Sequence, residues 1–153
     1  MNERQLEDWI CEHWEETPWS YAQFIGRQIE LKHGRLDLLI HDHGTTVVEL
    51  KARELKQRDV GQTLRYMHDI RSVLRALYHN NPFGRPVTGD EWEASEFDKC
   101  RRIQSDLNPP RNDGATSGIL VGTNATKKVI ASADGANIRT VLWKWDGCKE
   151  NFQ

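Results

Sequence analysis

The chain has 153 residues, of which 29% are charged and 37% hydrophobic, and its formal net charge is −2. This length suits a single domain with a core of its own, and the composition excludes an intrinsically disordered chain. The apolar runs are too short to span a membrane. The net charge excludes a protein that holds nucleic acid by bulk electrostatics.

The cysteines indicate a reducing compartment. Cys11, Cys100 and Cys148 are odd in number, widely spaced and form no CxxC pair. Such a pattern predicts reduced thiols, with no disulfide framework and no zinc site. No charged-then-apolar signal peptide opens the chain, so we expect a cytoplasmic protein with no membrane contact, in the host cytoplasm if the gene is viral.

Charged residues are distributed unevenly. Residues 1–16 contain six acids and one base, whereas Lys51–Arg75 contains seven bases and three acids. A basic middle segment beside an acidic N-terminus would let one face meet phosphates while the rest of the surface repels them. The alternative is that this charge run is only a solvated helix face.

The first half of the chain predicts one helix, three strands and a second helix. Asn2–Glu16 has apolar residues at helical spacing, with Asn2 as the candidate N-cap. Three β-rich segments predict strands at Phe24–Leu31, Leu36–His41 and Thr45–Lys51. A long helix is expected over Arg58–Tyr78, with an apolar stripe made of Val60, Leu64, Met67, Ile70, Leu74 and Leu77.

The second half begins with an insertion over about 79–117, rich in Pro and Gly at both ends, with one helix expected near Asp90–Leu107. Gly118–Thr123 then predicts a buried strand, Thr126–Ala133 a short helix and Arg139–Trp145 a final strand. This order predicts an α/β fold in which helices flank a mixed central sheet, all within one domain over residues 1–153.

The second and third strands carry the candidate site. A short Asp-His-Gly loop joins them into a β-hairpin. If His41 pairs with Thr45, then Asp37 lies directly opposite Glu49, with Cβ atoms about 4.5–5.5 Å apart. Lys51 lies two residues beyond Glu49 and so shares its face. This register brings two carboxylates and an ammonium group together.

Two carboxylates this close repel each other unless a cation lies between them. Mg²⁺ binds one or two carboxylates and takes water or phosphate oxygens at its other positions, so the trio favours a hydrolytic metal site. A cross-strand ion pair between Asp37 and Lys51, with Glu49 at the rim, is the alternative. His41 and His43 form an HxH pattern, but no Cys or His partner lies nearby, which favours plain turn residues.

Several separated motifs resemble the PD-(D/E)xK nuclease superfamily. GRLD and ELK match its two-strand motif, and GQTLRY is similar to the QxxxY element of its RecB-like branch. RQLEDWICEH, GRQIELKHGRLDLL and GILVGT resemble the catalytic domain of the NucS-like endonucleases. The resemblance covers roughly residues 3–78 and 117–146. It implies a restriction-endonuclease-like core of order αβββαβ and a nuclease dependent on Mg²⁺ or Mn²⁺ that hydrolyses DNA.

The resemblance also implies roles for single residues. Asp37 and Glu49 would bind the metal, with the Leu50 carbonyl as a third ligand, and Lys51 would be the catalytic lysine. Glu7 would match the acid on the first helix that completes or supports the metal site.

On the long helix, Gln62 and Tyr66 would reach over the site to orient water, metal ligands or DNA. Helical spacing places them in one polar stripe with Arg58, Arg65 and Asp69, although a solvated helix face explains the stripe too. Four arginines are candidate phosphate contacts, and each has the alternative of being a simple surface residue: Arg27, Arg35, Arg58 and Arg65.

The chain also departs from the pattern. These residues contain no counterpart of the N-terminal DNA-binding domain of the NucS-like enzymes, and the 79–117 insertion has no match there. The substrate form therefore stays open. A nuclease that acts on RNA and a non-catalytic nucleic-acid-binding module on the same fold remain as alternatives. Cleavage of both strands of a duplex would need a homodimer, with candidate surfaces at Trp92–Leu107 and the tryptophan-rich last strand.

Overall fold

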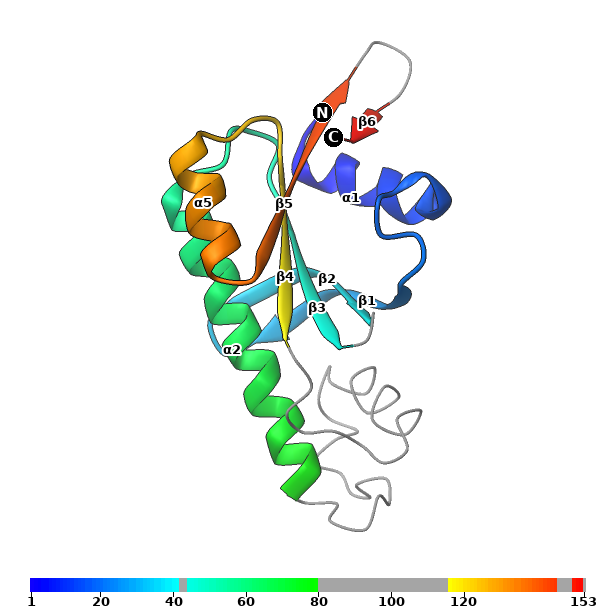
Figure 1. Ribbon diagram of the computed structural model, residues 1–153. Coiled ribbons are helices and arrows are strands. Elements are labelled where there is room, and N and C mark those ends of the chain that lie inside the picture. The colour runs from blue at the N-terminus through cyan, green and yellow to red at the C-terminus, as the bar shows by residue number, and fades with distance from the viewer. Residues whose placement is uncertain (42–43, 80–115, 146–149, 153) are drawn as a thin grey trace.

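A mixed β-sheet with helices on both faces forms the part of the chain that the computed structural model describes, residues 1–41, 44–79, 116–145 and 150–152 (Figure 1). In chain order the elements are α1 (Glu3–Glu12), the 3₁₀ turn η1 (Trp14–Glu16), β1 (Gln23–Leu31), β2 (Gly34–His41), β3 (Thr45–Leu50), α2 (Gln57–His79), β4 (Ser117–Gly122), α5 (Lys127–Gly135), β5 (Ile138–Trp145) and β6 (Glu150–Phe152). The predicted fold class is confirmed.

The described strands lie side by side in the order of the sequence, from β1 at one edge to β6 at the other. The first three strands form an antiparallel meander, β3, β4 and β5 run parallel, and β6 returns antiparallel to β5. Parallel neighbours need a crossover, and accordingly β3 is followed by α2 and β4 by α5. The sheet is therefore mixed, as the sequence predicts.

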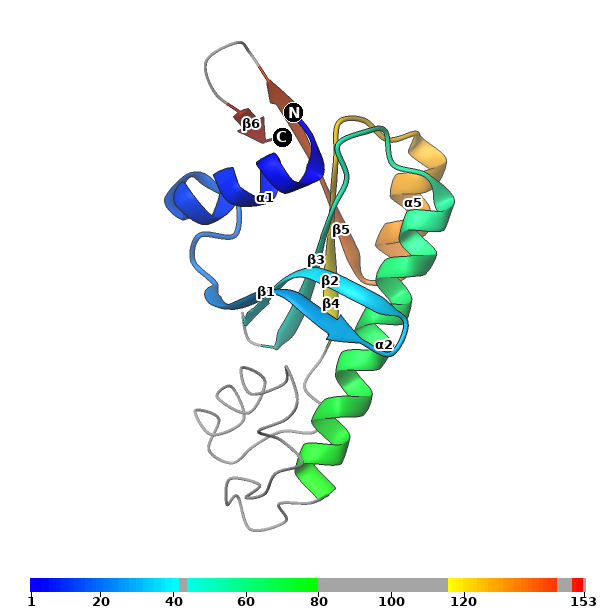
Figure 2. The ribbon, with the colours of Figure 1, turned by 180° about the vertical axis from the view of Figure 1, so that it is seen from behind.

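Two apolar cores lie on opposite faces of this sheet. Figure 2 shows α2 and α5 on one side and α1 on the other. Successive strand residues point to opposite faces, so Val47 joins the core under α2 while its neighbour Val48 joins the core under α1. The α1 core includes Leu6 and Ile10, which are fully buried. The face that carries Val47 also carries Glu49, two residues further along β3.

The predicted hairpin register is confirmed. β2 and β3 pair from His41↔Thr45 to Leu38↔Val48. The next position in this register sets Asp37 against Glu49. The hairpin is therefore the element that determines which charged side chains meet.

The first helix is shorter than predicted, although Asn2 caps it as expected and its side chain accepts a hydrogen bond from the third helical residue. The helix ends at Glu12, because His13 leaves the helical conformation at φ −120° and ψ 41°. A 3₁₀ turn follows, and in it Trp14 packs edge-on against Trp19 and Phe24. This aromatic packing takes the place of the helical continuation to residue 16.

At the other end of the chain, the structure adds a strand that the sequence did not predict. β6 has three residues and pairs with β5, with Phe152 against Trp143 in the ladder. Phe152 also contacts the rings of Trp9 and Trp19. Three residues are too few to show strand periodicity. Most of the predicted insertion, including its helix near residues 90–107, lies outside the described residues.

The apolar stripe of α2 is confirmed in part. Val60, Met67 and Ile70 are buried, but the prediction was wrong for Leu64, which is 40% exposed. Thr63 occupies the buried position instead, and its hydroxyl donates to the Asp59 carbonyl. The side chains of the last two predicted members, Leu74 and Leu77, lie outside the described residues.

The end of β4 is packed tightly against the segment that follows β3. A Cβ atom on Gly122 would lie 2.4 Å from Leu55 Cγ and 3.0 Å from the Arg53 carbonyl oxygen. We predict that Gly122→Ala lowers the free energy of unfolding by about 1–3 kcal/mol through overpacking. Urea denaturation followed by circular dichroism measures the change.

The matched control is Gly61→Ala on α2, where an added Cβ would meet nothing within 4 Å. Replacing a helical glycine there should raise the free energy of unfolding by about 0.5–1 kcal/mol. Equal effects of the two substitutions would contradict the close packing at Gly122.

Candidate active site

Three neighbouring strands each contribute one polar residue to a single row. The pairs Arg27↔Leu38 and Ile29↔Leu36 place Gln28 opposite Asp37 in β2. The β2–β3 register continues the row from Asp37 to Glu49. Gln28 donates a hydrogen bond to Asp37 Oδ1 at 3.4 Å, and Asp37 lies close enough to Glu49 to raise the pKa of Glu49. The row is the floor of the candidate site.

The two carboxylates of the row differ in environment. Asp37 is half-buried, and its Oδ2 accepts a hydrogen bond of 2.7 Å from the Leu50 amide. Glu49 is 2% exposed, and its Oε1 lies 3.5 Å from the Lys51 Nζ. The Oε2 atom of Glu49 is buried with no hydrogen-bond partner among the described residues. A buried oxygen in this state is rare in proteins, and either a proton that Glu49 shares with Asp37 or a bound cation would satisfy it.

Burial and the neighbouring Asp37 carboxyl group raise the pKa of Glu49 to about 10, and the Lys51 ammonium offsets only part of this effect. The side chain therefore carries a proton at neutral pH as long as no cation is bound. A divalent cation at Asp37 and Glu49 would displace that proton, since metal ligation requires the carboxylate form.

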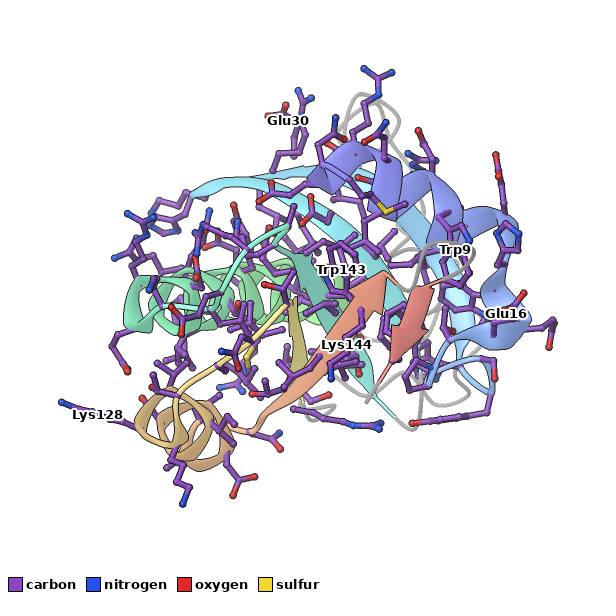
Figure 3. All side chains as sticks on the ribbon, turned by 90° about the horizontal axis from the view of Figure 1, so that it is seen from above. Trp9, Glu16, Glu30, Lys128, Trp143 and Lys144 are labelled. Carbon is purple, nitrogen blue, oxygen red and sulfur yellow. The ribbon has the colours of Figure 1, made fainter. Side chains whose placement is uncertain are left out.

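The Lys51 backbone is held on both sides at the end of β3. Its amide donates a hydrogen bond of 2.8 Å to the Val121 carbonyl, and its carbonyl accepts a hydrogen bond of 3.2 Å from the Trp143 indole Nε1. Trp143 is 4% exposed and lies in the interior of the molecule, as Figure 3 shows. The lysine thus leaves the sheet in a fixed direction toward Glu49.

The segment after Lys51 is fixed by a buried carboxylate at the start of α2. Asp59 is 2% exposed and receives two hydrogen bonds of 2.8 Å from the Arg53 guanidinium. It also accepts a hydrogen bond of 2.7 Å from the Lys56 amide. Burial alone would raise the pKa of Asp59, but these hydrogen bonds keep the pKa below its usual range. This carboxylate ties the loop to the helix that covers the site.

Gln62 and Tyr66 are brought together on α2 as predicted. Gln62 Nε2 donates a hydrogen bond of 2.8 Å to the Tyr66 hydroxyl oxygen. That oxygen would lie 2.7 Å from a Cβ on Gly34, which shows how closely the ring approaches the start of β2. Burial, with the nearby Glu49 charge, raises the pKa of Tyr66. Its hydroxyl therefore stays protonated beside the carboxylate pair.

The predicted polar stripe of α2 divides into separate groups. Asp69 is buried and binds His33 through both the ring Nδ1, at 2.8 Å, and the backbone amide, at 3.0 Å. It therefore anchors the turn between β1 and β2. Arg58 and Arg65 are exposed on the same helix and take no part in the row of polar side chains.

Glu7 reaches the site from α1. It is 3% exposed, and both of its carboxylate oxygens accept hydrogen bonds. Arg27 Nε donates to Oε1 at 2.6 Å, and Gln28 Nε2 donates to Oε2 at 2.5 Å. Burial raises the pKa of Glu7, and the Arg27 and Gln28 hydrogen bonds counteract this. The second arm of the Arg27 guanidinium binds Asp8 at 2.6 Å. Glu7 is thus placed one side chain away from Asp37, with Gln28 between them.

An open pocket of about 430 Å³ lies between α1 and the β1–β2 hairpin, next to Asp37. Three arginines line it together with the carboxylates described above: Arg4, Arg27 and Arg35. Arg27 and Arg35 are engaged by acids, Arg35 through a 3.0 Å hydrogen bond from its Nε to Glu30. Figure 3 shows Glu30 pointing outward from this hairpin. Arg58 and Arg65 do not line this pocket, and the contact of all four arginines with phosphate stays a prediction.

A divalent cation fits the donor set of this site. No group of three or more His, Cys, Asp or Glu side chains among the described residues could hold a metal ion by itself. Mg²⁺ does not require one, because it binds one or two carboxylates and completes its octahedron with water or substrate oxygens. Asp37, the end of β3 at Leu50 and the Glu49 oxygen that lacks a hydrogen-bond partner within the described residues would meet this requirement.

Comparison with known proteins supports the fold. No protein-family model and no curated protein sequence matches the chain. A repair endonuclease from Pyrococcus abyssi superposes with a TM-score of 0.53 at 18% sequence identity, covering 92% of this chain and 46% of that one. An EndoMS–dsDNA complex gives a TM-score of 0.47 at 16% identity, covering 92% and 44%. SfsA of Pyrococcus furiosus with Ca²⁺ gives 0.43 at 14% identity, covering 98% and 62%.

The chain therefore has a restriction-endonuclease-like α/β fold, and it spans less than half the length of the two endonuclease chains. No helix of the described residues is long and apolar enough to cross a membrane.

Sequence reasoning missed several residues that shape the site. Gln28 could have been found, because the two-residue Lys32–His33 turn sets it opposite Asp37. Nothing in the sequence marked Trp143 as the donor to the Lys51 carbonyl. The Arg53–Asp59 pair was likewise not distinguishable from ordinary surface charges.

The raised pKa of Glu49 has a consequence for stability. The folded protein holds this proton more tightly than the unfolded chain, so the contribution of Glu49 to the free energy of unfolding is greatest below about pH 4.5 and is lost as pH rises toward 10. We predict that Glu49→Gln raises the free energy of unfolding of the EDTA-treated protein by about 2 kcal/mol at pH 8. The gain should shrink toward pH 4.5 in urea titrations.

Glu16→Gln, at an exposed position of η1, is the control and should change stability by less than about 0.5 kcal/mol at either pH. A Glu49→Gln gain that does not depend on pH would contradict the assignment of the buried proton.

Proposed function

We propose that this chain is a metal-dependent nuclease that hydrolyses DNA phosphodiester bonds, as an endonuclease or nickase. One observation carries the proposal. A buried glutamate oxygen with no hydrogen-bond partner in the described part of the chain lies beside a second carboxylate and a lysine, at the end of adjacent strands of a nuclease-type fold. A chain that only bound nucleic acid would have no use for such a costly arrangement.

In this proposal Asp37, Glu49 and the Leu50 carbonyl hold Mg²⁺ or Mn²⁺. The cation would acidify a bound water and neutralise charge that develops on the phosphate. The Asp37 carboxylate is already oriented, because the Leu50 amide holds one of its oxygens.

Lys51 acts at the same face. Its ammonium lies against Glu49 and can donate to the attacking water or to a phosphate oxygen in the transition state. The hydrogen bonds to Val121 and from Trp143 fix its backbone, so the side chain starts from a fixed point beside Glu49. Gln62 and Tyr66 then limit the space above the carboxylates and orient a water or a phosphate oxygen.

DNA is the proposed partner. Arg4 lines the pocket beside Asp37 and has no ion-pair partner among the described residues, so its guanidinium is available to a phosphate. RNA remains the alternative substrate, because nothing described at the site recognises the sugar. One such site cuts one strand, so cleavage of both strands of a duplex requires a second copy of the chain.

The test is cleavage of labelled duplex, single-stranded DNA and RNA with Mg²⁺, Mn²⁺ or EDTA. We predict that wild-type protein cuts DNA only with metal and that Asp37→Asn abolishes cutting. Lys51→Ala should lower the single-turnover rate by about 10²–10³-fold with DNA affinity changed less than about threefold, since Lys51 acts in the transition state. Wild-type levels of cutting by Asp37→Asn would refute the proposal.

The two variants separate the two roles. Lys51→Ala should keep its Mn²⁺ affinity, whereas Asp37→Asn should lose it. Circular dichroism and urea denaturation confirm that both variants are folded. If Lys51→Ala cuts normally at saturating DNA but binds DNA poorly, Lys51 is a phosphate anchor rather than a catalytic residue.

A further inference from the structure

We propose that Gln28 and Arg27 occupy both oxygens of the Glu7 carboxylate through hydrogen bonds, and that this limits the site to one divalent cation. Glu7 is then a positioning residue and not a metal ligand. The inference rests on the proposed metal site at Asp37 and Glu49 and goes beyond it, because it defines how many ions the three acids of the site accept.

The first argument is the position of the Gln28 amide. Its Nε2 group donates to Glu7 Oε2 at 2.5 Å and to Asp37 Oδ1 at 3.4 Å, so the amide lies between the two carboxylates. This is where a second cation bridging Glu7 and Asp37 would have to bind. A neutral donor satisfies both oxygens without adding charge, and it must be displaced before an ion can enter.

The second argument is the state of Glu7 itself. Arg27 Nε donates a hydrogen bond of 2.6 Å to the other carboxylate oxygen, so both Glu7 oxygens already accept hydrogen bonds. The guanidinium also compensates the Glu7 charge inside the protein, where an unpaired carboxylate would be costly. Glu49 differs on both counts, because one of its oxygens has no partner among the described residues.

The third argument is the backbone of Gln28. Its φ is +53°, a left-handed conformation that non-glycine residues rarely adopt. Such strain persists where the surroundings require it and gathers at functional sites. Here the unusual conformation occurs at the one strand position opposite Asp37, where the amide bridges the two acids.

The test counts bound Mn²⁺ by isothermal titration calorimetry of the whole chain without nucleic acid, using Glu7→Gln, Gln28→Gly and the double variant. Glycine tolerates φ +53°, so Gln28→Gly should fold, which circular dichroism checks. We expect one ion in the wild type and in Glu7→Gln, with affinities within about threefold. Gln28→Gly should bind two ions, and the double variant should return to one.

The outcomes separate the two proposals. Two ions in the wild type, or one ion in Gln28→Gly, would overturn the role of Gln28. A loss of the wild-type ion in Glu7→Gln would make Glu7 a ligand and overturn the inference while leaving the metal site intact. Absence of any Mn²⁺ binding to the wild type would instead refute the metal site on which the inference rests.

Discussion

The site depends on the forced approach of two carboxylates, Asp37 and Glu49, on neighbouring strands. The hairpin register sets them against each other, and a slip by one residue would send every side chain of the strand to the opposite face. Glu49 is buried while it faces Asp37, and this is what raises its pKa. The fold thus holds a repulsive contact that a proton or a divalent cation relieves.

Other parts of the structure hold this contact in place. Trp143 and Val121 fix the strand end that carries Lys51, and the Arg53–Asp59 pair fixes the loop that follows. These anchors belong to β4, β5 and α2, so three elements beyond the hairpin contribute to the geometry. Stability and the proposed chemistry are therefore coupled: a neutral substitution that relieves the carboxylate repulsion would stabilise the fold and remove a ligand of the proposed metal site.

Much of this could be predicted from the sequence, because local rules determine it. The hairpin loop, the alternation of apolar residues and the helical stripe of α2 gave the strand register and the meeting of Asp37, Glu49 and Lys51. The end of α1 and the strand β6 could not be predicted, because the packing of Trp14 and Phe152 against distant aromatic residues decides them. A register argument extended to β1 would have found Gln28.

The partners of the arginines likewise could not be predicted from the sequence. Arg27 and Arg35 were predicted as phosphate contacts, which no observation tests, and the structure shows that both also contact acids, which the sequence did not indicate. Arg27 binds Glu7 and Asp8, so its main effect is on the carboxylates of the site. Sequence proximity predicts that a side chain is near a site, but only the three-dimensional arrangement shows which partner it takes.

The most direct test of the central claim is a crystal structure of the protein grown with Mn²⁺, using anomalous scattering to locate the metal. The geometry predicts one peak per chain, within coordination distance of carboxylate oxygens of both Asp37 and Glu49, with Glu7 still bound to Arg27 and Gln28. A peak elsewhere, with the Asp37–Glu49 pair unchanged and metal-free at saturating Mn²⁺, would contradict it.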